Sequence, residues 1–172
     1  MLIGEKVALR ARIESDVEIL NDEIYNDVAT DARASTSPWR PISPGSAASR
    51  FRLTEPTDDA ARFAAVELSD GQLAGAAILW GIDSHNRLAH IGVSLRPSFR
   101  GRGLGADVVR VLCDYGFRIR GLHRLQIETL ADNLAMIKAA KSNGFEIEGT
   151  LRKSAWLEGH FVDEVILGRL AD

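Results

Sequence analysis

The segment that decides the fold is Val93-Ser-Leu-Arg-Pro-Ser-Phe-Arg100-Gly101-Arg102-Gly103-Leu104-Gly105, which joins an expected strand to an expected helix. Glycines let the backbone adopt positive φ angles and approach a ligand closely. The free N–H groups and the dipole at the start of a helix attract an anion, and the side chains of Arg100 and Arg102 add positive charge. The segment therefore predicts a turn that binds a pyrophosphate between Arg100 and Gly105.

Two other phosphate-binding motifs bear on this turn. A P-loop is excluded because no Gly-Lys-Ser or Gly-Lys-Thr ends the glycine run. The spacing Gly101-x-Gly103-x-x-Ala106 fits the loose dinucleotide-binding pattern, but that pattern belongs after the first strand of a βαβ unit. Here the turn follows three strands linked by short loops. A dinucleotide-binding oxidoreductase is therefore a less favoured interpretation of the function, ranked below the two that are given later.

The segments before and after the turn predict a mixed sheet. Strands are expected at 62–68, 73–82 and 87–95, and the short loops between them favour an antiparallel meander. After the turn, apolar residues recur at helical spacing from Leu104 to Ile119. Further strands are expected at 7–11, 124–130, 146–152 and 161–170. Ser15 with Glu18 predicts a capped helix that runs to about residue 26. A short helix is expected from Ser43-Pro44, and another from Asp132 to about residue 143.

Length and composition exclude several classes of protein. The chain has 172 residues, enough for one domain spanning 1–172 with its own core. It is 45% hydrophobic and 26% charged, with a net charge of −3, so neither a disordered chain nor a general nucleic-acid binder is expected. No apolar run approaches the roughly 18 residues of a membrane span. The single cysteine, Cys113, favours the reducing cytoplasm, and the four histidines show no metal-ligand spacing.

The pattern Arg100-x-x-Gly103-x-Gly105 resembles the acyl-CoA signature of the GNAT (Gcn5-related) N-acetyltransferases. Asp132-Asn133-Leu-Ala and Lys141-Ser-Asn-Gly144-Phe145 are similar to that family's second cofactor helix. The closing segments resemble the ribosomal-protein N-terminal (Rim-type) branch, through Gly149-Thr-Leu-Arg152, Gly159, Asp163, Pro38-Trp39 and Pro41. The resemblance implies an α/β GNAT fold, whose mixed, mostly antiparallel sheet of about seven strands carries about four helices on its faces.

The resemblance also implies the cofactor site, which would hold acetyl-CoA as the acyl donor. The strand before the turn is expected to splay from the next strand, so that backbone groups of Val93 and Leu95 pair with the pantetheine arm. The backbone amides of the turn would hold the pyrophosphate, with Asn133 reaching the pantetheine arm or capping its helix. The amides are those of Arg100, Gly101, Arg102, Gly103, Leu104 and Gly105.

The family's reaction transfers an acyl group from a thioester to an amine. An amine with the usual pKa of about 10 is mostly protonated at neutral pH, so a general base is useful. His90 is the first candidate, because it lies where related proteins often carry a glutamate and histidine titrates near neutral pH. Glu67 and Glu128 are the rival candidates, and a purely structural role is open for all three.

Two positions depart from the family's pattern. Ala140 stands where many members have a tyrosine as general acid, and Met136 stands where some Rim-type members have a serine. A non-catalytic acyl-CoA-binding protein is therefore the main alternative to an N-acetyltransferase. For the enzyme, the acceptor is expected to be a primary amine. A protein N-terminus is favoured, and polyamines or small amines are the rivals.

The closing strands also bear on the oligomeric state. They carry large apolar side chains at Trp156, Phe161, Val162 and Ile166. A partly exposed apolar strand edge can pair with a second copy of the chain, so a homodimer is expected.

Overall fold

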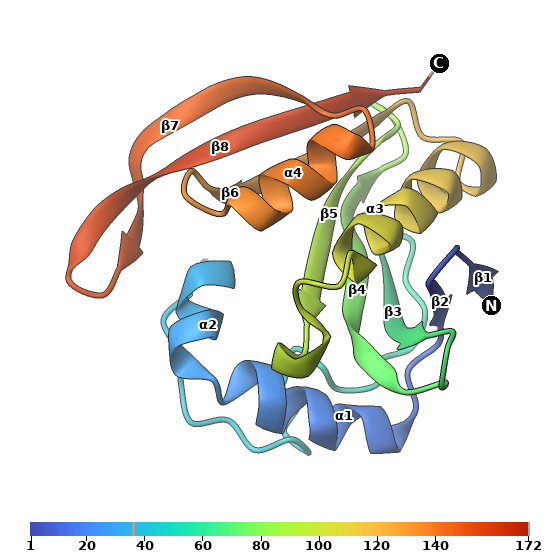
Figure 1. Ribbon diagram of the computed structural model, residues 1–172, viewed down its shortest axis with the longest axis vertical. Helices are drawn as coiled ribbons and strands as arrows, with labels where there is room; N and C mark the ends of the chain where they lie inside the picture. Colours follow the sequence, from blue (N-terminus) through green and yellow to red (C-terminus); the bar gives the residue numbers. More distant parts are fainter. Residues whose placement is uncertain (36, 172) are drawn as a thin grey trace.

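One sheet of eight strands organises the computed structural model, which describes residues 1–35 and 37–171 (Figure 1). Its strand order is β1-β2-β3-β4-β5-β6-β8-β7, and every neighbouring pair is antiparallel except β5 and β6. The strands are β1 (Leu2–Ile3), β2 (Val7–Arg10), β3 (Ala60–Glu67), β4 (Leu73–Asp83), β5 (Leu88–Leu95), β6 (Arg124–Leu130), β7 (Glu146–Leu157) and β8 (His160–Leu170). This confirms the predicted mixed, mostly antiparallel sheet. The strand beyond the expected seven is the short β1. All strands join this one sheet, and the single domain spanning 1–172 stays a prediction.

Helices cover both faces of the sheet, as expected (Figure 1). Helices α3 (Leu104–Asp114) and α4 (Leu134–Ser142) lie on one face, where Leu104, Val108 and Leu112 join the main core. Helices α1 (Glu14–Leu20) and α2 (Val28–Ala34) belong to the other side of the molecule. There a smaller core packs Leu20, Ile24, Tyr25 and Phe51 onto β3 and β4, against Ala64, Leu73 and Ala76.

The cap of the first helix lies two residues before its predicted position at Ser15. The cap residue is Ile13, and its N–H donates to Asp16 Oδ2 at 2.9 Å. Asp16, rather than the Ser15–Glu18 pair, therefore closes the helix start. The helix continues as a π-helical segment, Asn21–Tyr25, so its predicted end near residue 26 is confirmed.

The second helix lies elsewhere than predicted. It occupies Val28–Ala34, where the Asp27 side chain accepts the Thr30 N–H at 3.3 Å. The segment at Ser43-Pro44 forms only turns. Trp39, in the segment after this helix, packs against Tyr25 and donates from Nε1 to the Tyr25 carbonyl at 3.0 Å.

The single parallel pair of strands is short. β5 and β6 pair at only three positions, Leu88 with Arg124, Ala89 with Leu125 and His90 with Gln126. β5 continues to Leu95 and β6 to Leu130, so the two strands diverge beyond His90 and Gln126. The splay expected from the resemblance is therefore present, and it opens the middle of the sheet.

The β7–β8 hairpin forms the far edge of the sheet and extends well beyond its neighbours (Figure 1). Near its tip Trp156 and Phe161 are 61% and 57% exposed, and their rings meet edge to face at a centroid distance of 4.9 Å. An exposed apolar edge strand is the feature from which we predict a homodimer, and the homodimer stays a prediction. Within the described residues, no helix is long and apolar enough to cross a membrane.

Candidate active site

The backbone of β5 presents polar groups to the opening between β5 and β6. The Arg96 N–H donates to the Ala74 carbonyl at 2.9 Å, so the backbone groups of Arg96 face β4. Because these directions alternate along a strand, those of Ser94 also face β4, while those of Val93 and Leu95 face the opening. An extended chain with amide groups can pair with them there, as a neighbouring strand would.

The glycine turn follows at the end of β5 and leads into α3. Gly101 and Gly103 have φ angles of +73° and +81°, a region that side chains strongly disfavour. A Cβ added at Gly101 would meet no atom within 4 Å, so the space beside the backbone is open. Gly103 is the cap of α3, which begins at Leu104. The turn therefore has the open backbone and the helix start that a pyrophosphate requires.

Three residues of the turn differ in what they contribute to its geometry. Arg100 Nε donates to the Leu95 carbonyl at 3.0 Å, which fixes the turn against the end of β5. Leu104 is only 1% exposed, so only its backbone N–H can serve a ligand. A Cβ at Gly105 would lie 3.7 Å from Leu95 Cδ1, an ordinary contact, so close packing does not require this glycine.

Arg102 and Glu67, assigned to different roles in the sequence, form one ion pair. Glu67 Oε1 accepts from Arg102 Nη2 at 2.6 Å, and Glu67 is buried at the end of β3. The Arg102 guanidinium also lies over the Phe99 ring. Lys6, which the sequence analysis missed, donates from Nζ to the Arg102 carbonyl at 3.3 Å and adds a positive charge beside the turn. Nothing local in the sequence links residue 6 to residue 102.

His90 and Glu128 meet at the point where the strands diverge. His90 Nδ1 lies 3.5 Å from Glu128 Oε1, and the imidazole stacks on the Trp80 ring at a centroid distance of 4.3 Å. Among the described residues, His90 Nδ1 has no hydrogen-bond partner although it is buried. Gln126 Nε2 donates to Glu128 Oε1 at 2.7 Å, which holds the carboxylate toward the imidazole.

Glu67 lies far from this pair. His90 is opposite Trp80, which is opposite Ala60 at the start of β3, whereas Glu67 ends that strand. Seven residues of extended strand separate the two ends by roughly 20 Å. The structure therefore brings together two of the three candidate bases, His90 and Glu128, and it places the third beside the glycine turn.

Asn133 caps α4 in place of Asp132, which the sequence had suggested. Asn133 Oδ1 accepts the Met136 N–H at 3.2 Å, and its Nδ2 donates to Thr129 Oγ1 at 2.9 Å. These two bonds use one of the two N–H groups and one of the two lone pairs of the amide. Asp132 instead pairs with Arg33 of α2 at 2.6 Å, which joins α2 to the start of α4.

The positions that lack the family's proton donors are apolar and packed. Ala140 is fully buried and Met136 packs against the main core. Cys113 is also in that core, where burial raises the pKa of its thiol to about 11. A buried, protonated thiol is a poor nucleophile.

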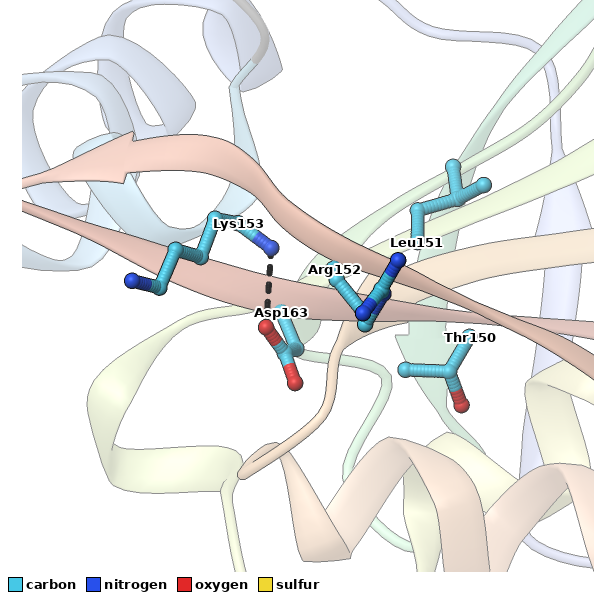
Figure 2. A pocket seen from close by; sticks show the side chains of 5 residues that line it. All are labelled: Thr150, Leu151, Arg152, Lys153 and Asp163. Atoms are coloured by element: carbon cyan, nitrogen blue, oxygen red, sulfur yellow. Dashed lines mark hydrogen bonds between the residues drawn. The ribbon is translucent and has the colours of Figure 1, made fainter.

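An open hollow of about 690 Å³ lies at the bend of the β7–β8 hairpin (Figure 2). At this bend Lys153 has a φ of +52°, and its backbone N–H donates to Asp163 Oδ1 at 2.8 Å. The Asp163 carbonyl accepts the Ala131 N–H at 2.9 Å, so the bend is attached to the turn before α4. The hollow is lined by Thr150, Leu151, Arg152, Lys153 and Asp163.

Comparison with known proteins shows which family this chain resembles. A family profile described as "Acetyltransferase (GNAT) domain" matches residues 6–146. The probable N-acetyltransferase YjcK of Bacillus subtilis (strain 168) is 30% identical over 127 residues, which cover 70% of this chain and 70% of that protein. Several other curated relatives are matched over only 50% to 64% of their length.

Two solved structures are similar over nearly the whole chain. The spermidine N-acetyltransferase of Vibrio cholerae in complex with CoA and spermine has a TM-score of 0.85 at 20% identity, covering 96% of this chain and 95% of that one. RimL, a ribosomal L7/L12 alpha-N-protein acetyltransferase in complex with coenzyme A, has a TM-score of 0.81 at 24% identity, covering 99% and 97%. These likenesses establish the fold, and the antiparallel meander before the turn excludes the dinucleotide-binding fold.

Proposed function

The chain belongs to the GNAT family of acetyl-CoA-dependent N-acetyltransferases, and we propose that it transfers the acetyl group to a primary amine by direct attack in a ternary complex. The observation that carries the proposal is the opening between β5 and β6, which begins at His90 and ends at the glycine turn. It joins a backbone that can pair with amides, a turn that can hold a pyrophosphate, and a histidine with a carboxylate.

Each part of the opening would serve one part of acetyl-CoA. The turn from Arg100 to Gly105 would hold the pyrophosphate through its N–H groups, with Lys6 nearby. The backbone of Val93 and Leu95 would pair with the pantetheine amides. A bound acetyl-CoA supplies the thioester to be attacked, and a backbone N–H that faces the opening near Val93 would donate to its carbonyl oxygen.

His90 is the base that we propose for the amine. An imidazole accepts a proton near neutral pH, and Glu128 at 3.5 Å stabilises the imidazolium that forms. The Trp80 ring fixes the plane of the imidazole. Glu67 does not fit this role, because its carboxylate is bound to Arg102 at the other end of the strand. Direct attack is favoured over an acyl-cysteine relay because Cys113, the only cysteine, lies in the core.

The acceptor is a primary amine, with a protein N-terminus favoured and polyamines or small amines as rivals. Similar proteins include enzymes named for each class, a spermidine acetyltransferase and a ribosomal-protein acetyltransferase.

Release of CoA thiol, followed with acetyl-CoA and a panel of peptides, amino acids and polyamines, tests the proposal. Sustained turnover with at least one amine is expected. If acetyl-CoA binds but no amine supports turnover, the result would instead support the non-catalytic alternative. Ala140 and Met136, which replace the family's proton donors, are the reason for that alternative.

A further inference from the structure

A row of residues crosses one face of the sheet and ends at the opening. Arg62 is opposite Ile78 on β4, and Ile78 is opposite Gly92 on β5. These residues share the face of Ala64 and Ala76, which lie two positions along their strands and contact the smaller core. A Cβ at Gly92 would lie 2.8 Å from Ile78 Cγ2, so the Ile78 side chain extends over Gly92. The floor of the row is therefore apolar.

Arg12 extends this row beyond Arg62. β2 ends at Arg10, which is opposite Ala64, so Arg12 comes beside Arg62 if the register continues. The hydrogen bond from Arg12 Nε to the Phe63 carbonyl, at 3.4 Å, supports this placement. Neighbouring strands are about 4.8 Å apart, so Arg62 and Gly92 are separated by about 10 Å, a distance that an arginine side chain and a small acceptor span together.

The arginine end of the row has more positive charge than its acids balance. Arg50 lies beside Arg12, since the Arg50 carbonyl accepts from Arg12 Nη1 at 3.2 Å and both guanidinium groups lie over Phe51. The two buried acids of this region are already paired, Asp16 with Arg10 and Asp31 with Arg50.

Arg12 and Arg62 differ from these paired arginines. Within the part of the chain that the structure describes, neither makes an ion pair, although the exposed Asp59 lies in the field of Arg62. Burial, with the charge of Arg62 second, lowers the pKa of Arg12 to about 10, whereas Asp16 acts in the opposite direction. A half-buried excess of positive charge of this kind is stabilised by an anion.

The other end of the row has the opposite character. Beyond Gly92, across the opening, lies β6, which carries the half-buried Gln126 and the exposed Glu128 on this face. His90, next along β5 on the same face, points to Glu128. A ligand lying along the row would meet arginines at one end and a carboxylate with an imidazole at the other.

From this polarity we infer that the acceptor is an amine that carries a carboxylate, which binds to Arg62 with Arg12 behind it, while the amine lies beside Glu128 and His90. The inference rests on the proposed function and narrows it. A free amino acid and a peptide N-terminus followed by an acidic residue share this chemistry. A polyamine lacks the carboxylate and would place a second cation among the arginines, so it is disfavoured.

The experiment compares pairs of acceptors that differ by one charge. L-alanine is paired with L-alaninamide, and the amide of the dipeptide Ala-Asp with the amide of Ala-Asn. KM and kcat are measured for the wild type, for Arg62→Gln and for Arg62→Lys. The control is Arg118→Gln, because Arg118 is exposed and, among the described residues, pairs with Asp114 of α3 alone. For each acceptor, KM and kcat of the variant are divided by those of the wild type. This ratio removes differences in intrinsic amine basicity between acceptors.

For one pair or both, Arg62→Gln is expected to raise KM for the carboxylate-bearing member about tenfold or more. The KM of the matching amide, and kcat for both members, should stay nearly unchanged. Arg62→Lys should retain most of the preference. The pair that responds identifies an amino acid or an acidic peptide as the source of the carboxylate. The inference would be overturned if Arg62→Gln changed KM equally for both members of both pairs. A lower KM for spermidine than for every carboxylate-bearing acceptor would overturn it too. Either result would leave acetyl transfer intact. Failure of every amine to release CoA would reject the proposed function itself.

Discussion

Glu67 and Arg102 join the end of β3 to the glycine turn through a 2.6 Å contact between Oε1 and Nη2. The pair neutralises one of the two arginines that the sequence offers to a pyrophosphate. It also occupies the carboxylate of one of the three candidate bases. The position of the turn therefore depends on a carboxylate that lies far from the opening at His90.

Replacing Glu67 with Gln should affect stability and leave the chemistry nearly unchanged. The variant keeps a polar side chain but loses an ion pair in which Arg102 is half exposed, so a loss of about 1 kcal/mol in the free energy of unfolding is expected. Urea denaturation measures this loss. The acidic limb of the pH–rate profile should persist, and its disappearance would restore Glu67 as the base.

Replacing His90 with Ala should lower kcat/KM by roughly 10²-fold, the usual scale for one acid–base group. His90→Gln should be nearly as poor, because an amide cannot accept the proton. The affinity for acetyl-CoA should barely change, since His90 is not proposed to contact the pyrophosphate. Glu128→Gln serves as the comparison. If Glu128→Gln has the large loss while His90→Ala stays near the wild type, the role of base belongs to Glu128.

Replacing Gly103 with Val should weaken the binding of acetyl-CoA at least tenfold, or about 1.4 kcal/mol. At a φ of +81° a β-branched residue is strained, and its side chain would occupy the side of the turn from which Lys6 approaches. Gly121→Val is the matched control, because Gly121 has a φ of +64° and open space around it. Isothermal titration measures the affinity of each folded variant for acetyl-CoA. If Gly103→Val binds as tightly as Gly121→Val, the pyrophosphate site is rejected.

Asp107 anchors the start of α3 to β2. Its Oδ2 accepts the N–H groups of Lys6 and Val7 at 2.7 and 3.0 Å, and its Oδ1 accepts from Arg110. Burial alone would raise the pKa of Asp107, but these hydrogen bonds together lower it below the ordinary value. Asp107→Asn places an amide among donors and should destabilise the fold by about 2 kcal/mol.

The pH dependence of that destabilisation follows from the direction of the pKa shift. A carboxyl whose pKa is lowered by folding stabilises the protein fully above its unfolded pKa of about 4 and loses this contribution below it. The stability difference between the wild type and Asp107→Asn should therefore be constant near pH 6 and shrink toward pH 3. Urea denaturation at the two pH values provides the measurement, and a difference that grew on acidification would contradict the assigned hydrogen bonds.

The predicted homodimer is tested through the hairpin tip. Light scattering at micromolar concentration should give twice the monomer mass, and Trp156→Ser with Phe161→Ser should shift it toward the monomer. A monomer mass for the wild type would exclude the dimer.

Elements with strong local patterns were predictable from the sequence, and contacts between distant segments were not. β6 spans Arg124–Leu130 as predicted, because apolar residues alternate there between turn signals. α2 was misplaced because Val28–Ala34 has no apolar periodicity. It is held by the ion pairs Asp31–Arg50 and Arg33–Asp132, whose partners lie 19 and 99 residues away.

The candidate site shows the same division. The glycine turn and the splay were predictable because the family motif covers consecutive residues. The pairing of Glu67 with Arg102 depends on how distant segments are brought together and was not predictable. The capping of α4 by Asn133, whose partners lie three and four residues away, is one of the two roles that we predict for it. The stacking of His90 on Trp80 likewise follows from the register of β4 and β5, which the loop length alone does not determine.

The divergence of β5 from β6 also divides the protection of amide hydrogens within a single central strand. Ser94 and Arg96 donate toward β4 and should exchange slowly, whereas Val93 and Leu95, one residue away, face the opening and should exchange quickly in the free protein. Strand β5 thus combines the slow exchange of a core strand with the fast exchange of an edge strand. A ligand that pairs with the open side would convert the second kind into the first.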